Sequence, residues 1–252
     1  MIPEAAVGYV ERALYARYLP DGDPPPVVRL LTPGAPTVFK NSVVYTKLGE
    51  AAADAAIEAT IGEYLEHGLP FRWIVAPSSR PADLRERLLA HGLRHAETTV
   101  GMLADPALEL APSPGVEVLP LTAERFEDWL RVQADAWSVP PAGIAYLRAS
   151  EAEFLSGRDA QVVAYLDGEP VGTACTQHHD DFAHLAGGAV RRDARRRGVY
   201  RAMLARRLAL LREAGVDVVT VHCLKTTSYP ICLGLGMRPV CELDYFFGNE
   251  AG

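Results

Sequence analysis

The most basic segment of this chain is a row of arginines that ends in a glycine. It reads Arg195-Arg196-Arg197-Gly198-Val199-Tyr200, and further arginines lie at positions 191, 192, 201, 206 and 207. A strand-like segment ends at Val190, and apolar residues at helical spacing begin near Tyr200. A strand–loop–helix unit aims backbone N–H groups and the positive end of the helix dipole at one place. Gly198 has no Cβ to obstruct a phosphate, and arginines attract it. The pattern predicts an anion site suited to a diphosphate.

Other ways of binding phosphate fit this sequence poorly. The chain has no Gly-x-x-x-x-Gly-Lys-Ser/Thr loop and no Gly-x-Gly-x-x-Gly at a first strand–helix turn, so neither a nucleotide-hydrolysing loop nor a dinucleotide fold is indicated. A nucleic-acid-binding protein should be basic, with aromatic residues between the cations. The formal net charge is −7, and the arginines form one local cluster, so no nucleic-acid partner is expected.

Length and composition suit an ordinary globular protein. A chain of 252 residues accommodates one large domain or two of ordinary size. No apolar stretch approaches the ~20 residues of a membrane span, and residues 1–4 lack the features of a signal peptide. The cysteines form no Cys-x-x-Cys pair, so we expect reduced thiols and a cytoplasmic protein. They are Cys175, Cys223, Cys232 and Cys241. No metal site is expected, because residues 178–181, His-His-Asp-Asp, are typical of a polar hairpin tip.

The order of elements predicts an α/β (α+β) fold. Pro112-Ser113-Pro114-Gly115 is the best linker and divides the chain into residues 1–111 and 112–252. Downstream we expect a strand at 116–119, a helix at 126–137 that Thr122 could cap, and a helix at 141–155. Strands at 161–166, 169–177 and 182–190 follow, the first two joined by a type I′ turn at Asp167-Gly168. A helix, a strand at 216–224, a short helix from 228 and a strand at 240–247 complete a mixed sheet with helices on both faces.

The front part resembles an incomplete copy of the rear part. Its pattern predicts strands at 37–48, 71–76 and 98–103, with helices at 51–67 and 81–90. Residues 88–94, Leu-Leu-Ala-His-Gly-Leu-Arg, resemble residues 232–238, Cys-Leu-Gly-Leu-Gly-Met-Arg, at an offset of 236 − 92 = 144. Such a repeat predicts a truncated first copy, and nothing in it resembles the arginine loop.

These motifs resemble the GNAT superfamily of acyl-CoA-dependent N-acyltransferases. The family signature is Gln/Arg-x-x-Gly-x-Gly/Ala between the fourth strand and the third helix. Arg195 and Gly198 match it, whereas Tyr200 replaces the last small residue. Residues 235–237, Leu-Gly-Met, look like the family's late Leu-Gly-Phe. Residues 73–102 are similar to the end of a degenerate GNAT domain found in tandem members.

The resemblance implies a mostly antiparallel sheet whose fourth and fifth strands splay apart, preceded by a truncated GNAT-like domain at 1–111. It implies acetyl-CoA as the acyl donor, with its pantetheine arm along the fourth strand and its pyrophosphate on the loop. The residues expected to contact it are Ala189, Val190, Arg195, Arg196, Arg197, Gly198, Val199, Tyr200 and Arg201.

The proton-transfer residues are less clearly implied. Many relatives have a tyrosine acid where this chain has Cys232, which is a candidate acid or an inert packing thiol. Tyr229 and Tyr200 are alternative acids. The usual glutamate base corresponds to Ala186, while His184 lies two residues earlier on the same strand face. His222 is the other candidate base. Several GNAT enzymes act mainly by positioning, so no strong base is required.

The resulting hypothesis is an N-acetyltransferase acting on a primary amine of a small molecule or peptide. The alternative is a catalytically weak or inactive CoA-binding regulatory module on the same fold. A homodimer is left open, and no membrane partner is expected.

Overall fold

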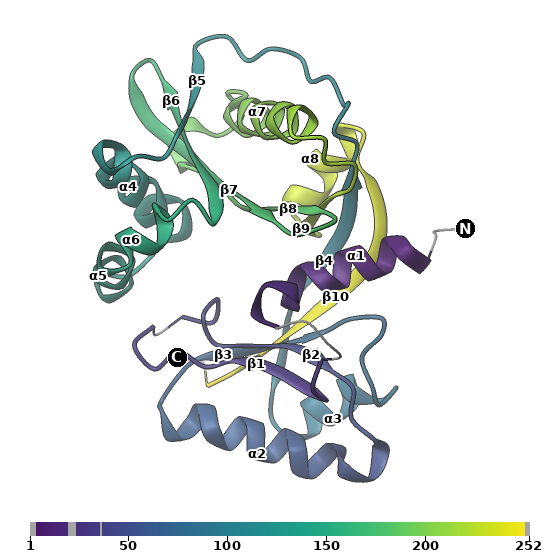
Figure 1. Ribbon diagram of the computed structural model, residues 1–252. Helices are drawn as coiled ribbons and strands as arrows, with labels where there is room; N and C mark the ends of the chain where they lie inside the picture. The colour runs from purple at the N-terminus through teal and green to yellow at the C-terminus, as the bar shows by residue number, and fades with distance from the viewer. Residues whose placement is uncertain (1–3, 20–23, 36, 250–252) are drawn as a thin grey trace. The chain divides into compact units, whose positions relative to one another are not determined.

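The computed structural model describes residues 4–19, 24–35 and 37–249. Residues 1–3, on which the signal-peptide prediction partly rests, lie outside this range. The chain divides into two compact units (Figure 1). Unit 1 combines Met1–Met102, His222–Leu233 and Pro239–Gly252, and unit 2 combines Leu103–Val221 and Gly234–Arg238. The predicted division of the chain into domains at residues 1–111 and 112–252 stays a prediction.

Unit 2 contains a sheet in the strand order β9-β8-β7-β6-β5. Its strands are β5 (Val116–Pro120), β6 (Asp159–Leu166), β7 (Glu169–His178), β8 (Ala183–Val190) and the first three residues of β9 (Val219–Leu224). All neighbours pair antiparallel except β8 and β9, which pair parallel. This is the mixed, mostly antiparallel sheet that the sequence predicts.

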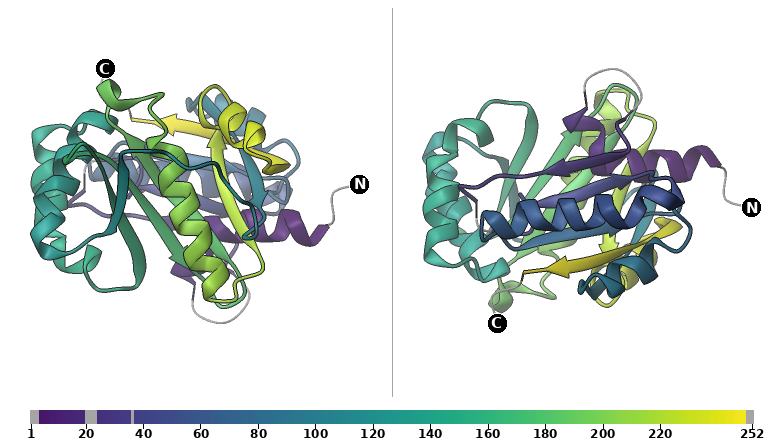
Figure 2. Two further views of the ribbon diagram at one scale, coloured as in Figure 1. Left: turned by 90° about the horizontal axis from the view of Figure 1, so that it is seen from above. Right: turned by 90° about the horizontal axis from the view of Figure 1, so that it is seen from below.

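Helices cover both faces of this sheet, because the residues of β6 alternate between two cores. Val162 and Ala164 pack with Met203 of α7 (Val199–Glu213) on one face. Val163 packs with Trp129 of α4 (Phe126–Trp137) on the other face (Figure 2). The remaining helical segments of unit 2 are η3 (Ala123–Arg125), α5 (Pro141–Ala149), α6 (Glu151–Phe154) and η4 (Arg192–Ala194).

In unit 2 the sequence predicted one turn correctly and two features of the helices wrongly. Asp167 and Gly168 have φ values of 54° and 83°, which confirms the predicted type I′ turn. The single helix predicted at 141–155 is wrong, since it breaks at Ser150, whose hydroxyl donates to the carbonyl of Tyr146 at 3.0 Å. Capping of the 126–137 helix by Thr122 is also wrong. Segment η3 intervenes, and the Thr122 hydroxyl donates to Glu124 instead.

Unit 1 contains strands in the order β1-β2-β3-β10-β4, and β4 is followed by the end of β9. The new strands are β1 (Val27–Leu30), β2 (Ser42–Thr46), β3 (Phe71–Val75), β4 (Arg94–Ala104) and β10 (Arg238–Gly248). Its helical segments are α1 (Glu4–Tyr15), η1 (Ala16–Tyr18), η2 (Glu50–Ala52), α2 (Ala53–Glu66), α3 (Leu84–Ala90) and α8 (Ser228–Gly234). The sequence did not predict α1 or β1, and the strand expected at 37–48 is only β2.

The core of unit 1 lies where α2 and α3 cover one side of β2 and β3. Tyr64 of α2 stacks on Phe71 at 4.4 Å between ring centroids, and its hydroxyl donates to the carbonyl of Leu30 at 2.7 Å. The fully buried Trp73 donates its indole N–H to Thr46 at 3.0 Å. The polar ends of these buried aromatics are thus satisfied, as burial requires.

The internal repeat is visible in the bounds of the elements. Helices α3 and α8 start 228 − 84 = 144 residues apart, and strands β4 and β10 start 238 − 94 = 144 residues apart. The order β2–α2–β3–α3–β4 matches β8–α7–β9–α8–β10. The first two strands of each copy also form a parallel pair, β2 with β3 in the first copy and β8 with β9 in the second.

The two copies exchange their last strands. Strand β10, at the end of the second copy, pairs antiparallel with β3 of the first, from Asp244 opposite Val75 to Gly248 opposite Phe71. Strand β4, at the end of the first copy, lies between β10 and β9. This exchange explains why unit 1 includes residues from both ends of the chain.

Candidate active site

Two adjacent glycines bend β8 at its centre. The β7–β8 register shifts between Thr173 and Cys175, so Gly187 and Gly188 together face one residue of β7. Gly187 has φ of 57°, which few other residues tolerate. A Cβ on Gly188 would lie 3.0 Å from the ring of Tyr200, so a side chain there would displace the ring.

The pairing of β8 with β9 ends at this bulge. Ala183, His184 and Leu185 pair with residues 219–221, and β8 then continues for five more residues to Val190. The predicted parting of the fourth and fifth strands is therefore confirmed. Backbone groups of a strand edge released in this way can hydrogen-bond an extended ligand.

The arginine loop forms a turn ahead of α7 with two left-handed residues. Arg196 and Gly198 have φ values of 65° and 81°, on either side of Arg197. Alternation of left-handed and ordinary backbone turns successive N–H groups toward one side, which makes a concave site for anions. Helix α7 has 15 residues and begins at Val199, with its first bond from Ala202 N–H to the carbonyl of Gly198 at 2.9 Å. Its first turn carries no acidic residue.

Some arginines of the cluster serve the fold. The guanidinium of Arg191 pairs with Asp193 at 2.9 Å, and that of Arg197 pairs with Asp167 at 3.2 Å. Arg201 donates to the hydroxyl of Ser113 at 3.2 Å, and Ser113 donates to the carbonyl of Gly198 at 3.0 Å. The predicted linker is thereby fastened to the start of α7. Arg195 and Arg196 are exposed beside the turn.

A buried arginine of α7 donates hydrogen bonds to backbone carbonyls next to the bulge. Arg207 of α7 is 2 % exposed and donates to the carbonyl of Cys175 at 3.0 Å and to that of Ala186 at 3.4 Å. Ala186 directly precedes the two glycines. In the sequence Arg207 was only one member of the arginine cluster, although its apolar neighbours at helical spacing mark it as facing the sheet.

His184 is buried at the last rungs of the β8–β9 ladder. Its Nδ1 lies 2.9 Å from the hydroxyl of Thr220, which in turn donates to the carbonyl of Ala183 at 3.3 Å. With the hydroxyl hydrogen used in that bond, Nδ1 carries the proton and Nε2 is the basic nitrogen. The role of His184 as a base stays a prediction.

His222 is held in a structural role. Its Nε2 lies 2.9 Å from the carbonyl of Val10, and because a carbonyl only accepts, this nitrogen carries the proton. Burial lowers the pKa of His222 to about 4. The ring is therefore neutral at pH 7 and is a weak base.

The two proposed acids occupy different surroundings in unit 1. Cys232 is fully buried beside Cys223, and hydrogen bonding between the two thiols, with burial, raises the pKa of Cys223 above its ordinary value. Tyr229, one turn earlier on α8, lines a pocket of about 200 Å³. The pocket also contains Lys225 and Glu242, whose charged groups lie 2.5 Å apart. Both acids remain predictions, and no motif or spacing in the sequence pointed to Lys225 or Glu242.

The described residues were predicted to lack a metal site, disulfides and a membrane-spanning helix. No group of three or more His, Cys, Asp or Glu side chains among the described residues could hold a metal ion. All four cysteines are free thiols, as the sequence predicted. Within residues 4–19, 24–35 and 37–249, no helix combines the length and apolar character that crossing a membrane requires.

Comparison with protein families matches residues 123–229, from η3 through β8, the arginine loop and α7 to the start of α8, to the model described as "Acetyltransferase (GNAT) family". These residues belong to the GNAT family. The match leaves the whole of the first copy, β2 to β4, outside it. A comparison with curated proteins found no match.

Solved structures share the GNAT fold over nearly the whole chain. A GCN5-related N-acetyltransferase from Kribbella flavida is 18% identical with a TM-score of 0.71, covering 98% of this chain and 96% of that one. A tandem GNAT protein from the clavulanic acid biosynthesis pathway is 15% identical with a TM-score of 0.58, covering 99% and 96%. A functionally unknown protein from Staphylococcus epidermidis is 16% identical with a TM-score of 0.71, covering 95% and 97%. The tandem arrangement of two GNAT-like copies is thus supported.

Proposed function

We propose that the protein is an N-acetyltransferase that moves an acetyl group from acetyl-CoA to a primary amine of a small molecule or peptide. The observation that carries the proposal is the turn at Arg196-Arg197-Gly198 at the start of α7. It combines two left-handed residues, a helix N-terminus without an acidic first turn, and exposed arginines. These features suit a diphosphate, the most highly charged part of the CoA molecule.

The residues of the second copy fit the rest of the donor equally well. A Cβ on Gly198 would lie 2.8 Å from the Ser113 hydroxyl, so the turn depends on glycine at this point. The backbone of Ala189 and Val190 lies on the strand edge beyond the bulge and would hold the pantetheine by strand-like hydrogen bonds. The bulge, supported by Arg207, sets the direction of that edge.

When bound, acetyl-CoA supplies an activated acyl group. The chain's own part is then to fix the donor, exclude water and relay protons. An amine of pKa about 10.4 must lose a proton before it attacks, and Nε2 of His184 is the candidate to receive it, directly or through water. The Tyr229 hydroxyl is the candidate to donate a proton to the departing sulfur. Orientation alone supplies much of the rate enhancement in such two-substrate reactions.

A second function, a CoA-binding module with little activity, is favoured by one observation. The position of the usual acid is the buried Cys232, which shares a hydrogen bond with Cys223. A thiol in such surroundings is a poor proton donor.

Release of free CoA thiol in the presence of acetyl-CoA and a panel of primary amines would separate the two functions. Amine-dependent release by the native chain, reduced at least ~10-fold in Arg195→Glu/Arg196→Glu, is expected for the enzyme. Arg206→Glu/Arg212→Glu, at two exposed positions further along α7, reverses the same number of charges and should leave the rate unchanged. Tight binding of acetyl-CoA without amine-dependent release would favour the regulatory module instead.

A further inference from the structure

Strand β3 of the first copy carries an arginine whose guanidinium is held by neighbouring side chains. The Nε of Arg72 donates to the hydroxyl of Ser42 at 2.9 Å, and that hydroxyl donates to the carbonyl of Val38 at 2.7 Å. The Cζ of Arg72 lies 4.9 Å from the ring centroid of Phe39 and 5.2 Å from that of Tyr245. Aromatic rings at such distances attract a guanidinium and restrict its orientation. The side chain is therefore positioned before a ligand arrives.

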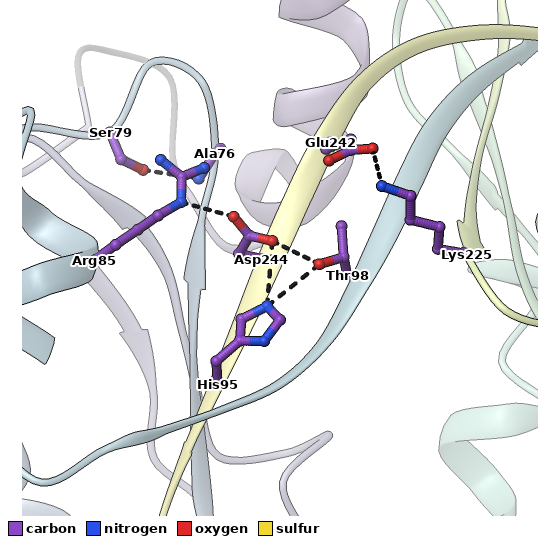
Figure 3. Close-up of polar contacts among 8 residues, drawn as sticks. All are labelled: Ala76, Ser79, Arg85, His95, Thr98, Lys225, Glu242 and Asp244. Carbon is purple, nitrogen blue, oxygen red and sulfur yellow. Dashed lines mark hydrogen bonds and ion pairs between the residues drawn. The ribbon is translucent and has the colours of Figure 1, made fainter. Parts of the chain in front are cut away.

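Arg72 lacks the carboxylate that other arginines of unit 1 have. Arg29 pairs with Glu63 at 2.7 Å, and Arg85 pairs with Asp244 at 2.6 Å (Figure 3). Both of these arginines are exposed, whereas Arg72 is half-buried. Among residues 4–19, 24–35 and 37–249, the two terminal nitrogens of Arg72 have no hydrogen-bond acceptor and no ion-pair partner. Arginines that leave water are usually paired, so the absent carboxylate is one that a ligand can supply.

The charge of this guanidinium lies in a poorly solvated place. Burial lowers the pKa of Arg72 below its ordinary value, although Tyr245 and Glu97 oppose the change. Burial, and then the charge of Arg72, lower the pKa of His222. Arginine nevertheless remains charged at pH 7. A charge with little water around it attracts an oxyanion that reaches it more strongly than the same charge in bulk water does.

The loop before β2 keeps an aromatic ring at the surface beside this cation. Phe39 is 57% exposed, while Asn41 in the same loop is fully buried. The side-chain amide of Asn41 donates to the carbonyl of Ala35 at 2.7 Å and to that of Thr37 at 3.0 Å. The loop is thus braced from inside, although its phenyl ring contributes little to the core. An apolar surface next to a cation suits a ligand that has an anionic group and an apolar part.

We propose that the first copy binds a small-molecule carboxylate at Arg72. The two terminal nitrogens of the guanidinium donate the two parallel hydrogen bonds that arginine forms with a carboxylate. The ring of Phe39 contacts the apolar part of the ligand next to the carboxylate. All residues of this site belong to unit 1, so the site is separate from the donor turn in unit 2 and does not depend on the proposed transfer reaction.

Titration of the full chain with benzoate and with benzamide, followed by NMR without acetyl-CoA, tests the proposal. The two probes have the same ring and nearly the same shape, but only benzoate has two charged oxygens. Benzoate should bind at least ~10-fold more tightly, and Arg72→Met should abolish that preference. Arg72→Lys should lose most of it, because an ammonium cannot form the bidentate pair. Arg94→Met, at an exposed position of β4, is the matched control and should change nothing.

A further variant tests the electrostatics of the site. Glu97→Gln should tighten benzoate binding several-fold, because it removes a negative charge near Arg72.

Each other outcome overturns the proposal. Equal binding of the two probes, or a preference that survives in Arg72→Met, would show that Arg72 does not bind a carboxylate. A preference retained in full by Arg72→Lys would refute the bidentate contact, and one lost equally in Arg94→Met would show general charge attraction. Weaker benzoate binding in Glu97→Gln would also contradict the proposal. Thermal unfolding verifies that the variants are folded. Acetyl-CoA titration of the same samples separates this inference from the proposed function, because either ligand can bind without the other.

Discussion

The two copies of the repeated unit have the same order of strands and helices, but they differ in the charged residues at the N-terminus of the first long helix, α2 in the first copy and α7 in the second. In the first copy, η2 and the first turn of α2 carry Glu50 and Asp54. Carboxylates at a helix N-terminus satisfy its positive end. In the second copy the first turn of α7 has no acid, and arginines and Gly198 precede it. The same architecture therefore presents carboxylates at this helix start in one copy and arginines in the other, which is why the proposed donor site lies in the second copy.

A second difference lies along β10. Asp244 is held by a cation of the first copy and has a side chain only 17% exposed, while Glu242 is held by a cation of the second copy and is 53% exposed. The two carboxylates lie two residues apart on one strand face, yet the side chain of Asp244 is much more buried than that of Glu242. The more exposed of the two, Glu242, lines the pocket beside Tyr229.

The largest expected effect comes from removing the first copy. Deleting residues 1–110 removes β3 and β4, which flank β10, and exposes the buried side chains of that strand, Val240, Leu243, Tyr245 and Phe246. We expect the remaining chain to aggregate and to lose cooperative unfolding, measured by circular dichroism and gel filtration. Co-expression with residues 1–110 should restore a soluble complex. A monomeric remainder with unchanged thermal stability would disprove the strand exchange.

The next effect concerns the buried arginine of the second copy. Arg207→Met leaves the carbonyls of Cys175 and Ala186 without their donor, and we expect the free energy of unfolding to fall by about 3 kcal/mol. Acetyl-CoA affinity should fall as well, because the bulge loses its support. Arg206→Met, at the exposed neighbouring position, should change stability by less than about 0.5 kcal/mol. Equal effects in urea unfolding of the two variants would refute the role of Arg207.

The buried His222 of β9 makes the stability of the fold depend on pH. His222 has a folded pKa of about 4, below its unfolded value near 6.5. The unfolded state therefore binds more protons between these values, and stability falls as pH falls. We expect a loss of about 2 kcal/mol between pH 7 and pH 5 from this group. His222→Gln should flatten the stability curve measured by urea unfolding over that range. An unchanged slope would show that the ring is accessible.

The smallest effect compares the two β10 carboxylates. Burial alone would raise the pKa of Asp244, but hydrogen bonds from Thr98 and Arg85 outweigh it and lower that pKa below its ordinary value. Its stabilisation is thus present above about pH 4 and is lost as pH falls further. Asp244→Asn should cost about 1 kcal/mol at pH 7 and less at pH 3, whereas Glu242→Gln should cost almost nothing at either pH. Calorimetric unfolding of both variants checks the ranking.

The sequence was sufficient where local chemistry decides the structure. Asp167-Gly168 specified its turn, and Gly198 has the left-handed backbone, with φ of 81°, that glycine tolerates best. It was insufficient where distant residues decide. Strand β1 has only four residues, and Arg207 gains its meaning only from the carbonyls of β7 and β8. Helix α1, by contrast, has its buried residues Ala6, Val10 and Ala13 at helical spacing and was predictable from that signal. The exchange of β4 and β10 could not be predicted, because each strand suits either neighbour equally well by local pattern.

The central claim is that only the second copy binds a donor, through the loop before α7. Calorimetric titration with acetyl-CoA, of the native chain and of Arg195→Glu/Arg196→Glu, tests it most directly. We predict one molecule bound per chain, a dissociation constant raised at least ~10-fold in the loop variant, and no change in Glu50→Arg in the first copy. Two molecules bound per chain, or an affinity unchanged in the loop variant, would contradict the account.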